Sequence, residues 1–274
     1  MIYQYSNRLG TKPAGLDPDA KAYANAVVAT GATVSAAQKN AISDFVKTGK
    51  ADGWYSSIKR LYLPIWGAAS PNAIDIIGLT SGLFIGTLTH GAGFVQGNGT
   101  TGFFDIGSTP NALGMSTSGG SAFALVYEQD SRTDTRYFLG QTDGSNRRVF
   151  LRQDGSTAIS TTLYNAGISV TNSSSARTGV FIGVVNTTSN RYLKRRASSG
   201  IAYTTTRTET DANIQSSARN VFAMALNNNG TVASWCDAKM GLYGLGLGFS
   251  DSDGNKFTLA LKTMWETCTG LTIP

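Results

Sequence analysis

The side chains that could perform acid–base chemistry are few in this sequence and lie far apart. The single histidine, His90, stands among glycines in a stretch that favours a turn, and no serine or cysteine nucleophile motif accompanies it. Glu128, Asp130 and Asp134 form a group of carboxylates of the kind that can serve a glycosidase or bind Ca²⁺. Carboxylates in solvated loops are far commoner, so a glycan-cleaving enzyme is only our third hypothesis.

Two further patterns resemble ligand-binding loops but lack essential parts. Asp251, Asp253 and Asn255 are spaced like the start of a Ca²⁺ loop, but no glutamate follows at the required distance, and negative charge at a helix start explains them. Residues 97–102 satisfy G-x-G-x-x-G, yet they lie between two strand-like runs with no following helix, which predicts a hairpin turn. We therefore assign no catalytic, metal-binding or cofactor-binding residue, and we expect a protein that is not an enzyme and needs no cofactor.

The composition indicates a β-rich globular protein with a weakly charged surface. Of the 274 residues 41% are hydrophobic and only 15% are charged, against a usual charged share of about 25%. Low charge suits a subunit of an assembly, because charged residues are depleted from interface cores. The net charge is +6, but the only basic cluster is Lys194, Arg195 and Arg196, which follow Arg191. We interpret this cluster as a solvated strand end or loop and expect no specific nucleic-acid partner.

The two cysteines and the hydropathy of the chain indicate in which cellular compartment the protein is made. Cys236 and Cys268 provide neither a disulfide framework nor metal-ligand spacing, so we expect free thiols in a protein made in a reducing cytosol. The first apolar run is too short for a signal peptide, and no run of about 18 apolar residues occurs. We expect no membrane insertion.

Helical signals are concentrated near the start of the chain. Asp17 is a good N-cap before Pro18, and Ser35 begins a second helix with a capping box that Gly49 is expected to end. Asp52 is expected to cap a third, short helix that continues through Leu61. These segments predict a helical unit with a large apolar face.

Beyond this unit the hydrophobic period changes to that of short strands. Alternating or apolar runs separated by turn signals predict a mainly β protein, an antiparallel β-sandwich or jelly roll, followed by a helix capped at Ser250 or Asp251. The expected division of the chain is an N-terminal arm at 1–15, a helical unit packed on the sandwich at 16–64, the β-sandwich at 65–249, and a C-terminal helix and tail at 250–274.

Several stretches resemble a family of tailed-bacteriophage virion proteins. They are Asp17-x-Asp-Ala-x-Ala-Tyr, the run from Val34 to Phe45, Lys50-Ala-Asp-Gly-Trp, Leu61-Tyr-Leu-Pro-Ile-Trp-Gly, the run from Leu83 to Asp105, and Gly244-Leu-Gly-Leu-Gly-Phe-Ser-Asp. The resemblance covers residues 16–270. It implies a structural tail, fibre or head-decoration protein located in the virion, with a sandwich similar to concanavalin-A-like lectin or LamG domains.

Our leading hypothesis is therefore a non-enzymatic structural component of a phage virion. The arm 1–15 would bind other virion proteins, and we expect a homo-oligomer, with a trimer suggested by analogy to projecting phage proteins. The alternative is a lectin-like module that binds host-surface glycan, for which the polar turns at 141–147 and 186–192 are the candidates. Fold class cannot choose between them, because one sandwich supports many functions.

Overall fold

The computed structural model describes most of the chain in nine ranges. These are residues 15–115, 121–130, 134–144, 147–155, 158–165, 169–173, 177–186, 190–208 and 218–274. Residues 1–14, nearly all of the predicted arm, lie outside them, so the expected role of the arm stays a prediction. Among the described helices, none has the length and apolar character needed to cross a bilayer.

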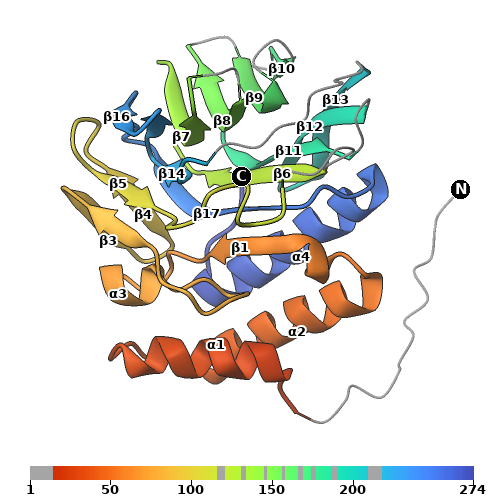
Figure 1. Ribbon diagram of the computed structural model, residues 1–274. Helices are drawn as coiled ribbons and strands as arrows, with labels where there is room; N and C mark the ends of the chain where they lie inside the picture. Colours follow the sequence, from red (N-terminus) through yellow and green to blue (C-terminus); the bar gives the residue numbers. More distant parts are fainter. Residues whose placement is uncertain are drawn as a thin grey trace, which may run out of the picture.

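Two sheets and a helical layer make up the molecule (Figure 1). The helices are α1 (Pro18–Ala29), α2 (Ala36–Asp52), the 3₁₀ turn η1 (Tyr55–Ser57), α3 (Ala69–Asn72) and α4 (Asp251–Thr269). The eight-stranded sheet has the order β13 (Gly200–Thr208), β12 (Asn190–Ala197), β11 (Gly179–Val185), β6 (Ala122–Glu128), β17 (Lys239–Gly246), β4 (Phe94–Gly97) and β3 (Leu88–Gly91), and β1 (Ile58–Tyr62) also pairs with β17.

The second sheet has nine strands. Its order is β10 (Ser169–Asn172), β9 (Ala158–Asn165), β8 (Arg147–Asp154), β7 (Arg136–Thr142), β14 (Phe222–Ala223), β5 (Phe103–Asp105) and β2 (Leu83–Ile85), with β15 (Leu226–Asn228) and β16 (Thr231–Ala233) attached through β7. Apart from the short parallel contact of β15 with β7, the strand pairs of both sheets are antiparallel. This arrangement confirms the predicted mainly β sandwich with helices at its two ends.

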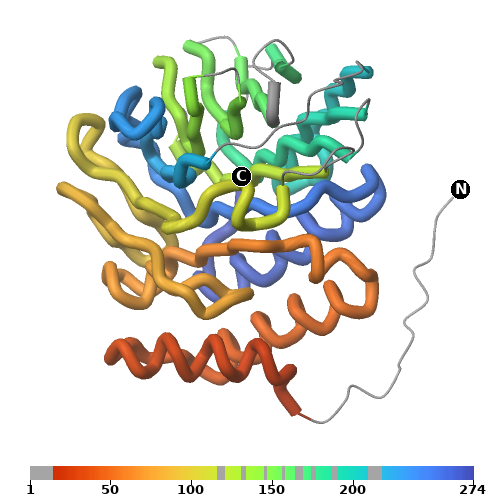
Figure 2. The backbone as a smooth tube through the Cα atoms, viewed as in Figure 1, coloured from red at the N-terminus to blue at the C-terminus, as the bar shows by residue number. Residues whose placement is uncertain are grey.

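The layers run from helices through the eight-stranded sheet to the nine-stranded sheet (Figures 1 and 2). One core lies between the helices and the eight-stranded sheet and contains Val27, Trp54, Phe257 and Trp265. The other core lies between the two sheets. Its members include Phe104, Val126, Leu139, Leu151, Ile159 and Phe181. The eight-stranded sheet is thus buried on both faces, because each face contributes to a core.

Local capping signals fix three helix starts as predicted. Asp17 accepts a hydrogen bond from the amide of Asp19 in front of Pro18. Ser35 and Gln38 form both bonds of the capping box, and Ser250 caps α4. These signals depend only on residues a few positions apart, so the sequence is sufficient to predict them.

Two helical predictions are wrong. Gly49 does not end α2, which continues to Asp52 and terminates at the left-handed Gly53. Gly49 instead faces Trp54, and a Cβ at this position would lie only 2.5 Å from the indole ring. The predicted third helix is η1 followed by strand β1, because Ile58 to Tyr62 pair with β17.

Candidate functional site

The outer face of the nine-stranded sheet is the side of the sandwich that no described helix covers (Figure 1). Residues directly opposite each other in an antiparallel pair share one face of the sheet. The register therefore places one row of side chains on this outer face: Leu83, Asp105, Phe222, Gly140, Phe150, Thr162 and Ser169. Their neighbours along the strands, such as Leu139 and Leu151, point into the core between the sheets.

The central feature of this face is an arginine patch, formed by Tyr137, Phe150, Arg152, Asp154 and Ser160. The guanidinium of Arg152 stacks 5.4 Å from the Tyr137 ring centroid and 4.9 Å from that of Phe150. Its Nη1 donates to the Tyr137 hydroxyl at 2.7 Å, and its Nε donates to Ser160 Oγ at 3.3 Å. Nε also forms an ion pair with Asp154 Oδ1 at 2.6 Å.

The arginine patch is fixed internally and still reaches solvent. Phe150 and Ser160 are buried, whereas the side chains of Arg152 and Asp154 are each 28% exposed. Guanidinium has five N–H donors in a rigid fork. Two of its nitrogens, Nε and Nη1, make the contacts described above. The patch therefore presents a guanidinium that is held over two aromatic rings and against the Asp154 carboxylate, which also accepts a hydrogen bond from the Ser160 hydroxyl.

An aromatic patch lies on the same face toward its other end. Phe103 and Phe222 pack with ring centroids 4.6 Å apart, and the half-buried Trp235 meets Phe103 edge-on at 5.6 Å. Asp105 shares the face with Phe103 and accepts a hydrogen bond from Asn220 at 3.2 Å. Carbohydrate sites commonly combine apolar and aromatic surface with a few directed polar groups, and both patches contain these components.

The three carboxylates considered from the sequence do not form a surface site. Glu128 is fully buried at the end of β6, and its Oε1 accepts the backbone N–H of Asp130 at 2.8 Å. Asp134 pairs with Arg136, which also contacts Asp237. These contacts give the carboxylates of Glu128 and Asp134 structural partners, so the geometry does not favour the glycosidase hypothesis.

His90 and the glycine-rich motif also have structural roles. His90 lies on β3, with Nδ1 3.1 Å from the Asn72 amide nitrogen and its ring edge-on to Phe84, and burial lowers its pKa. Residues 97–102 form a turn in which Asn98 Oδ1 accepts three backbone N–H groups. The predicted hairpin is wrong, because β4 and β5 belong to different sheets and this turn crosses between them.

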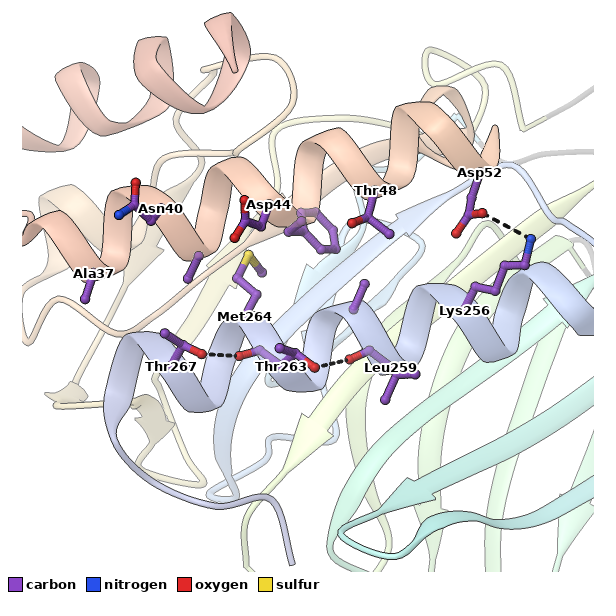
Figure 3. Close-up of a pocket in the computed structure, with 13 residues that line it drawn as sticks. Ala37, Asn40, Asp44, Thr48, Asp52, Lys256, Leu259, Thr263, Met264 and Thr267 are labelled. Atoms are coloured by element: carbon purple, nitrogen blue, oxygen red, sulfur yellow. Dashed lines mark hydrogen bonds and ion pairs between the residues drawn. The ribbon is translucent and has the colours of Figure 1, made fainter. Parts of the chain in front are cut away.

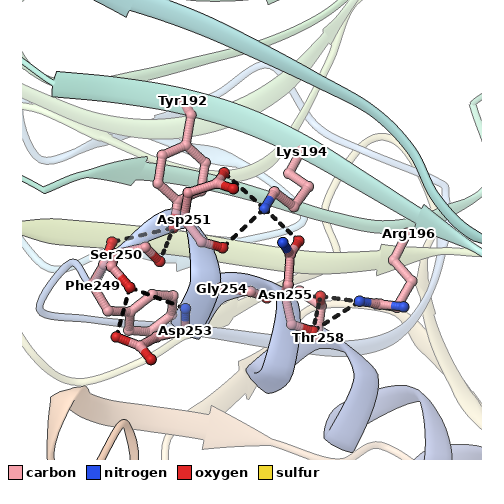
Figure 4. A network of polar contacts seen from close by, with 10 residues as sticks. All are labelled: Tyr192, Lys194, Arg196, Phe249, Ser250, Asp251, Asp253, Gly254, Asn255 and Thr258. Atoms are coloured by element: carbon pink, nitrogen blue, oxygen red, sulfur yellow. Dashed lines mark hydrogen bonds and ion pairs between the residues drawn. The ribbon is translucent and has the colours of Figure 1, made fainter. Parts of the chain in front are cut away.

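The residues that resembled a Ca²⁺ loop instead bind a buried lysine (Figure 4). The ammonium of Lys194 lies 2.5 Å from Asn255 Oδ1, 2.8 Å from Asp251 Oδ1 and 3.1 Å from the Asp251 carbonyl oxygen. Asp253 accepts a hydrogen bond from the Ser250 hydroxyl at 2.7 Å. Burial lowers the pKa of Lys194, and its pairing with Asp251 acts in the opposite direction.

The interpretation of the basic cluster as a solvated strand end is wrong. Lys194 and Arg196 lie on the face of β12 that α4 covers, and the Arg196 guanidinium donates to Thr258 Oγ1 and the Asn255 carbonyl (Figure 4). Arg191 faces the other way and donates to the Leu163 carbonyl of the second sheet at 2.6 Å. All of these side chains, together with Arg195, are buried. They hold layers together and are not available to a phosphate backbone.

The remaining side chains that could act as acids, bases or nucleophiles are also buried. Asp75 is fully buried, which raises its pKa, and it accepts backbone N–H groups of Leu61, Ile77 and Gly78. Cys236 and Cys268 are buried thiols. In the portion of the chain that is described, no three His, Cys, Asp or Glu side chains are grouped closely enough to hold a metal ion.

The arginine patch was missed by sequence reasoning, which looked for glycan contacts in turns. The turns at 141–147 and 186–192 each include residues outside the described ranges, so that prediction is untested. A signal was present in β8, where Arg148, Phe150, Arg152 and Asp154 alternate with Val149, Leu151 and Gln153. Alternation of this kind marks a strand with one apolar and one polar face.

Comparisons with known proteins place this fold among distant neighbours. No protein-family model and no curated protein sequence matches the chain. The Ruminococcus gnavus IT-sialidase CBM40 bound to α2,3-sialyllactose has a TM-score of 0.43 and 13% identity, over 60% of this chain and 95% of that one. The K499G mutant of NanB sialidase from Streptococcus pneumoniae has a TM-score of 0.43 and 12% identity, over 64% of this chain and 28% of the sialidase.

A toxin structure is similar over a longer stretch. Botulinum neurotoxin type C, whose cell entry depends on interaction with two ganglioside molecules, has a TM-score of 0.49 and 10% identity, over 75% of this chain and 51% of that one. Because all three TM-scores are below 0.5, these likenesses carry no argument about what this chain binds.

Proposed function

We propose that this chain is a non-catalytic carbohydrate-binding module, and that its ligand site is the outer face of the nine-stranded sheet. The observation that carries the proposal is the arginine patch. Arg152 offers guanidinium N–H groups at a partly exposed position, while two aromatic rings, a serine hydroxyl and the Asp154 carboxylate fix the guanidinium. Sugar hydroxyls accept hydrogen bonds, so a charged N–H donor held in one position suits them.

Pre-organisation of the arginine patch supports binding over a purely structural role. A long arginine side chain loses rotamer freedom when it binds a ligand, and this loss reduces affinity. Here the cost is already met in the free protein, because stacking and two hydrogen bonds hold Arg152 in place. The aromatic patch adds the half-buried Trp235, which offers apolar surface for the face of a second sugar ring.

A glycan array followed by calorimetric titration of the best ligand tests this proposal. We expect Arg152→Ala to weaken binding by roughly 10- to 100-fold, the loss expected for a hydrogen bond to a charged group. Lys21→Ala, which removes a positive charge from the exposed side of α1, is the matched control and should bind normally. An array without ligands, or equal affinity of Arg152→Ala and the unaltered protein, would overturn the proposal.

We also propose that the module belongs to a tailed-phage particle, as the resemblance of residues 16–270 implies. The low charged fraction of 15% supports a place within an assembly. In this setting the outer face of the nine-stranded sheet would recognise host-surface glycan while other surfaces contact virion proteins. Incubating the purified protein with particles that lack it, and measuring its mass in solution, tests the location and the expected homo-oligomer; a monomer that binds no particle would exclude both.

A further inference from the structure

A groove between α2 and α4 lies on the opposite side of the molecule from the proposed glycan site (Figures 1 and 3). Its volume is about 640 Å³. Phe45, Ala41, Ala260 and Met264 provide apolar lining, and the side chain of Leu259 is largely uncovered, at 52% exposure. The alanines in the lining have short side chains, which leave space between the longer side chains of the two helices.

The charged lining of this groove is mainly acidic. It contains Asp44 and Asp52 but one lysine, Lys256, whose Nζ lies 3.2 Å from Asp52 Oδ1 (Figure 3). Two carboxylates and one ammonium give the lining a formal charge of −1. An apolar groove with this charge fits an apolar segment that carries positive charge.

The described chain begins beside this groove. The Gly15 carbonyl accepts a hydrogen bond from Lys47 Nζ of α2 at 2.6 Å, and the Asp17 amide donates to Ser43 Oγ of the same helix at 2.8 Å. Lys47 precedes Thr48, which lines the groove. Whatever precedes Gly15 therefore starts next to α2.

Residues 1–14 have the composition that the groove requires. They include Ile2, Tyr3, Tyr5 and Leu9, and their charged residues, Arg8 and Lys12, are both basic. Fourteen residues span at most about 50 Å when fully extended. The lining from Ala37 to Asp52 of α2 covers only about 22 Å at 1.5 Å per residue. The segment can reach every part of the groove from Gly15.

We propose that residues 1–14 dock in the α2/α4 groove of their own molecule, with aromatic and aliphatic side chains on the apolar lining and the basic residues toward Asp44 and Asp52. The occupant comes from the same molecule because a short tether gives the segment an effective concentration near the millimolar range. A segment from a second copy competes poorly at micromolar protein. This inference is independent of the proposed glycan site.

Thiol alkylation in the full chain tests the docking. The thiol introduced by Leu259→Cys lies in the groove, whereas Cys236 and Cys268 are buried. We expect it to react at least about 10-fold faster when Ile2, Tyr3 and Tyr5 are all replaced by Ser. The matched control replaces Gln4, Ser6 and Asn7 by Ala and should leave the rate unchanged. Equal rates in all three proteins overturn the proposal, and Thr263→Cys, exposed in the same groove, repeats the measurement if the first variant does not fold.

A disulfide pair identifies the origin of the segment. Tyr5→Cys combined with Leu259→Cys should form a disulfide within one molecule, seen as a monomer that has lost both new thiols. Tyr5→Cys combined with Thr171→Cys, on the other side of the sandwich, should remain reduced. A covalent dimer would assign the groove to a second copy. Protection of the groove only on addition of particles would assign it to another virion protein, and either result would overturn docking within one molecule.

Discussion

Lys194 and Arg152 lie on different sheets of the same sandwich, and they illustrate how layering decides what a basic residue does. Lys194 is fully buried under α4, where Asp251 and Asn255 surround its ammonium. Arg152 lies on a face without a described helix, keeps 28% of its side chain exposed, and has one carboxylate partner. The difference teaches that a basic residue covered by a helix bonds two layers of the protein together, whereas one that no helix covers can bind a ligand.

The largest effect on stability should come from removing the buried side chain of Lys194. Lys194→Ala deletes three contacts to α4 and leaves a cavity beside Tyr192. We expect a loss of about 3–5 kcal/mol in the free energy of unfolding, measured by urea denaturation. Lys194→Met keeps the volume without a charge and should recover most of this loss. If the free energy of unfolding of Lys194→Ala stayed within about 1 kcal/mol of that of the unaltered protein, Lys194 would not be what holds α4 to the sheet.

A smaller loss is expected at the neighbouring arginine. Thr258→Val preserves the shape of the side chain but removes the oxygen that accepts from Arg196 Nε at 2.9 Å. Because this donor is buried, leaving it without its acceptor should cost about 1–3 kcal/mol. Thr263→Val on the exposed side of α4 is the matched control, and its unfolding curve should hardly move. Similar losses from both variants would show that helix propensity, rather than the buried contact, is responsible.

Alkaline pH should weaken the same layer contact through Tyr192. Its hydroxyl donates to the carbonyls of Phe249 and Ser250, and burial raises its pKa above the usual value. The unfolded chain loses this proton near pH 10 while the folded chain retains it. Stability from this group is therefore complete below pH 10 and falls as the pH rises further. Tyr192→Phe should cost about 1 kcal/mol at neutral pH and flatten the alkaline fall; an unchanged slope would exclude Tyr192 as its cause.

The smallest effect on stability is expected at the partly exposed Arg152. Arg152→Ala removes a partly exposed ion pair, and such pairs contribute about 0–1 kcal/mol. Its thermal midpoint should move by only a few degrees while carbohydrate binding weakens by roughly 10- to 100-fold. A destabilisation as large as that of Lys194→Ala would remove the distinction between the two sites and give Arg152 a structural role like that of Lys194.

How far the sequence could predict this molecule depends on the range of the interactions involved. Caps at Asp17, Ser35 and Ser250 involve residues within three positions, and all three were predictable. The strand content followed from alternation and turn residues, and it led to the correct fold class. The helix predicted over Ile58 to Tyr62 is wrong because these residues pair with β17, which lies far along the chain. This pairing overrode a helical pattern in the sequence.

The function of each charged side chain was decided by the tertiary structure alone. Alternation along β12 and β8 identifies which residues share a face of each strand, but it does not say which face a helix will cover. That depends on α4 returning from the end of the chain to pack over Lys194 and Arg196, and on the nine-stranded sheet keeping its outer face free of the described helices. The sequence by itself determined the elements and their ends, because these follow from local backbone and capping preferences. Only the folded chain, through contacts between distant segments, decided which basic residues bond the helices and sheets together and which one is presented to a ligand.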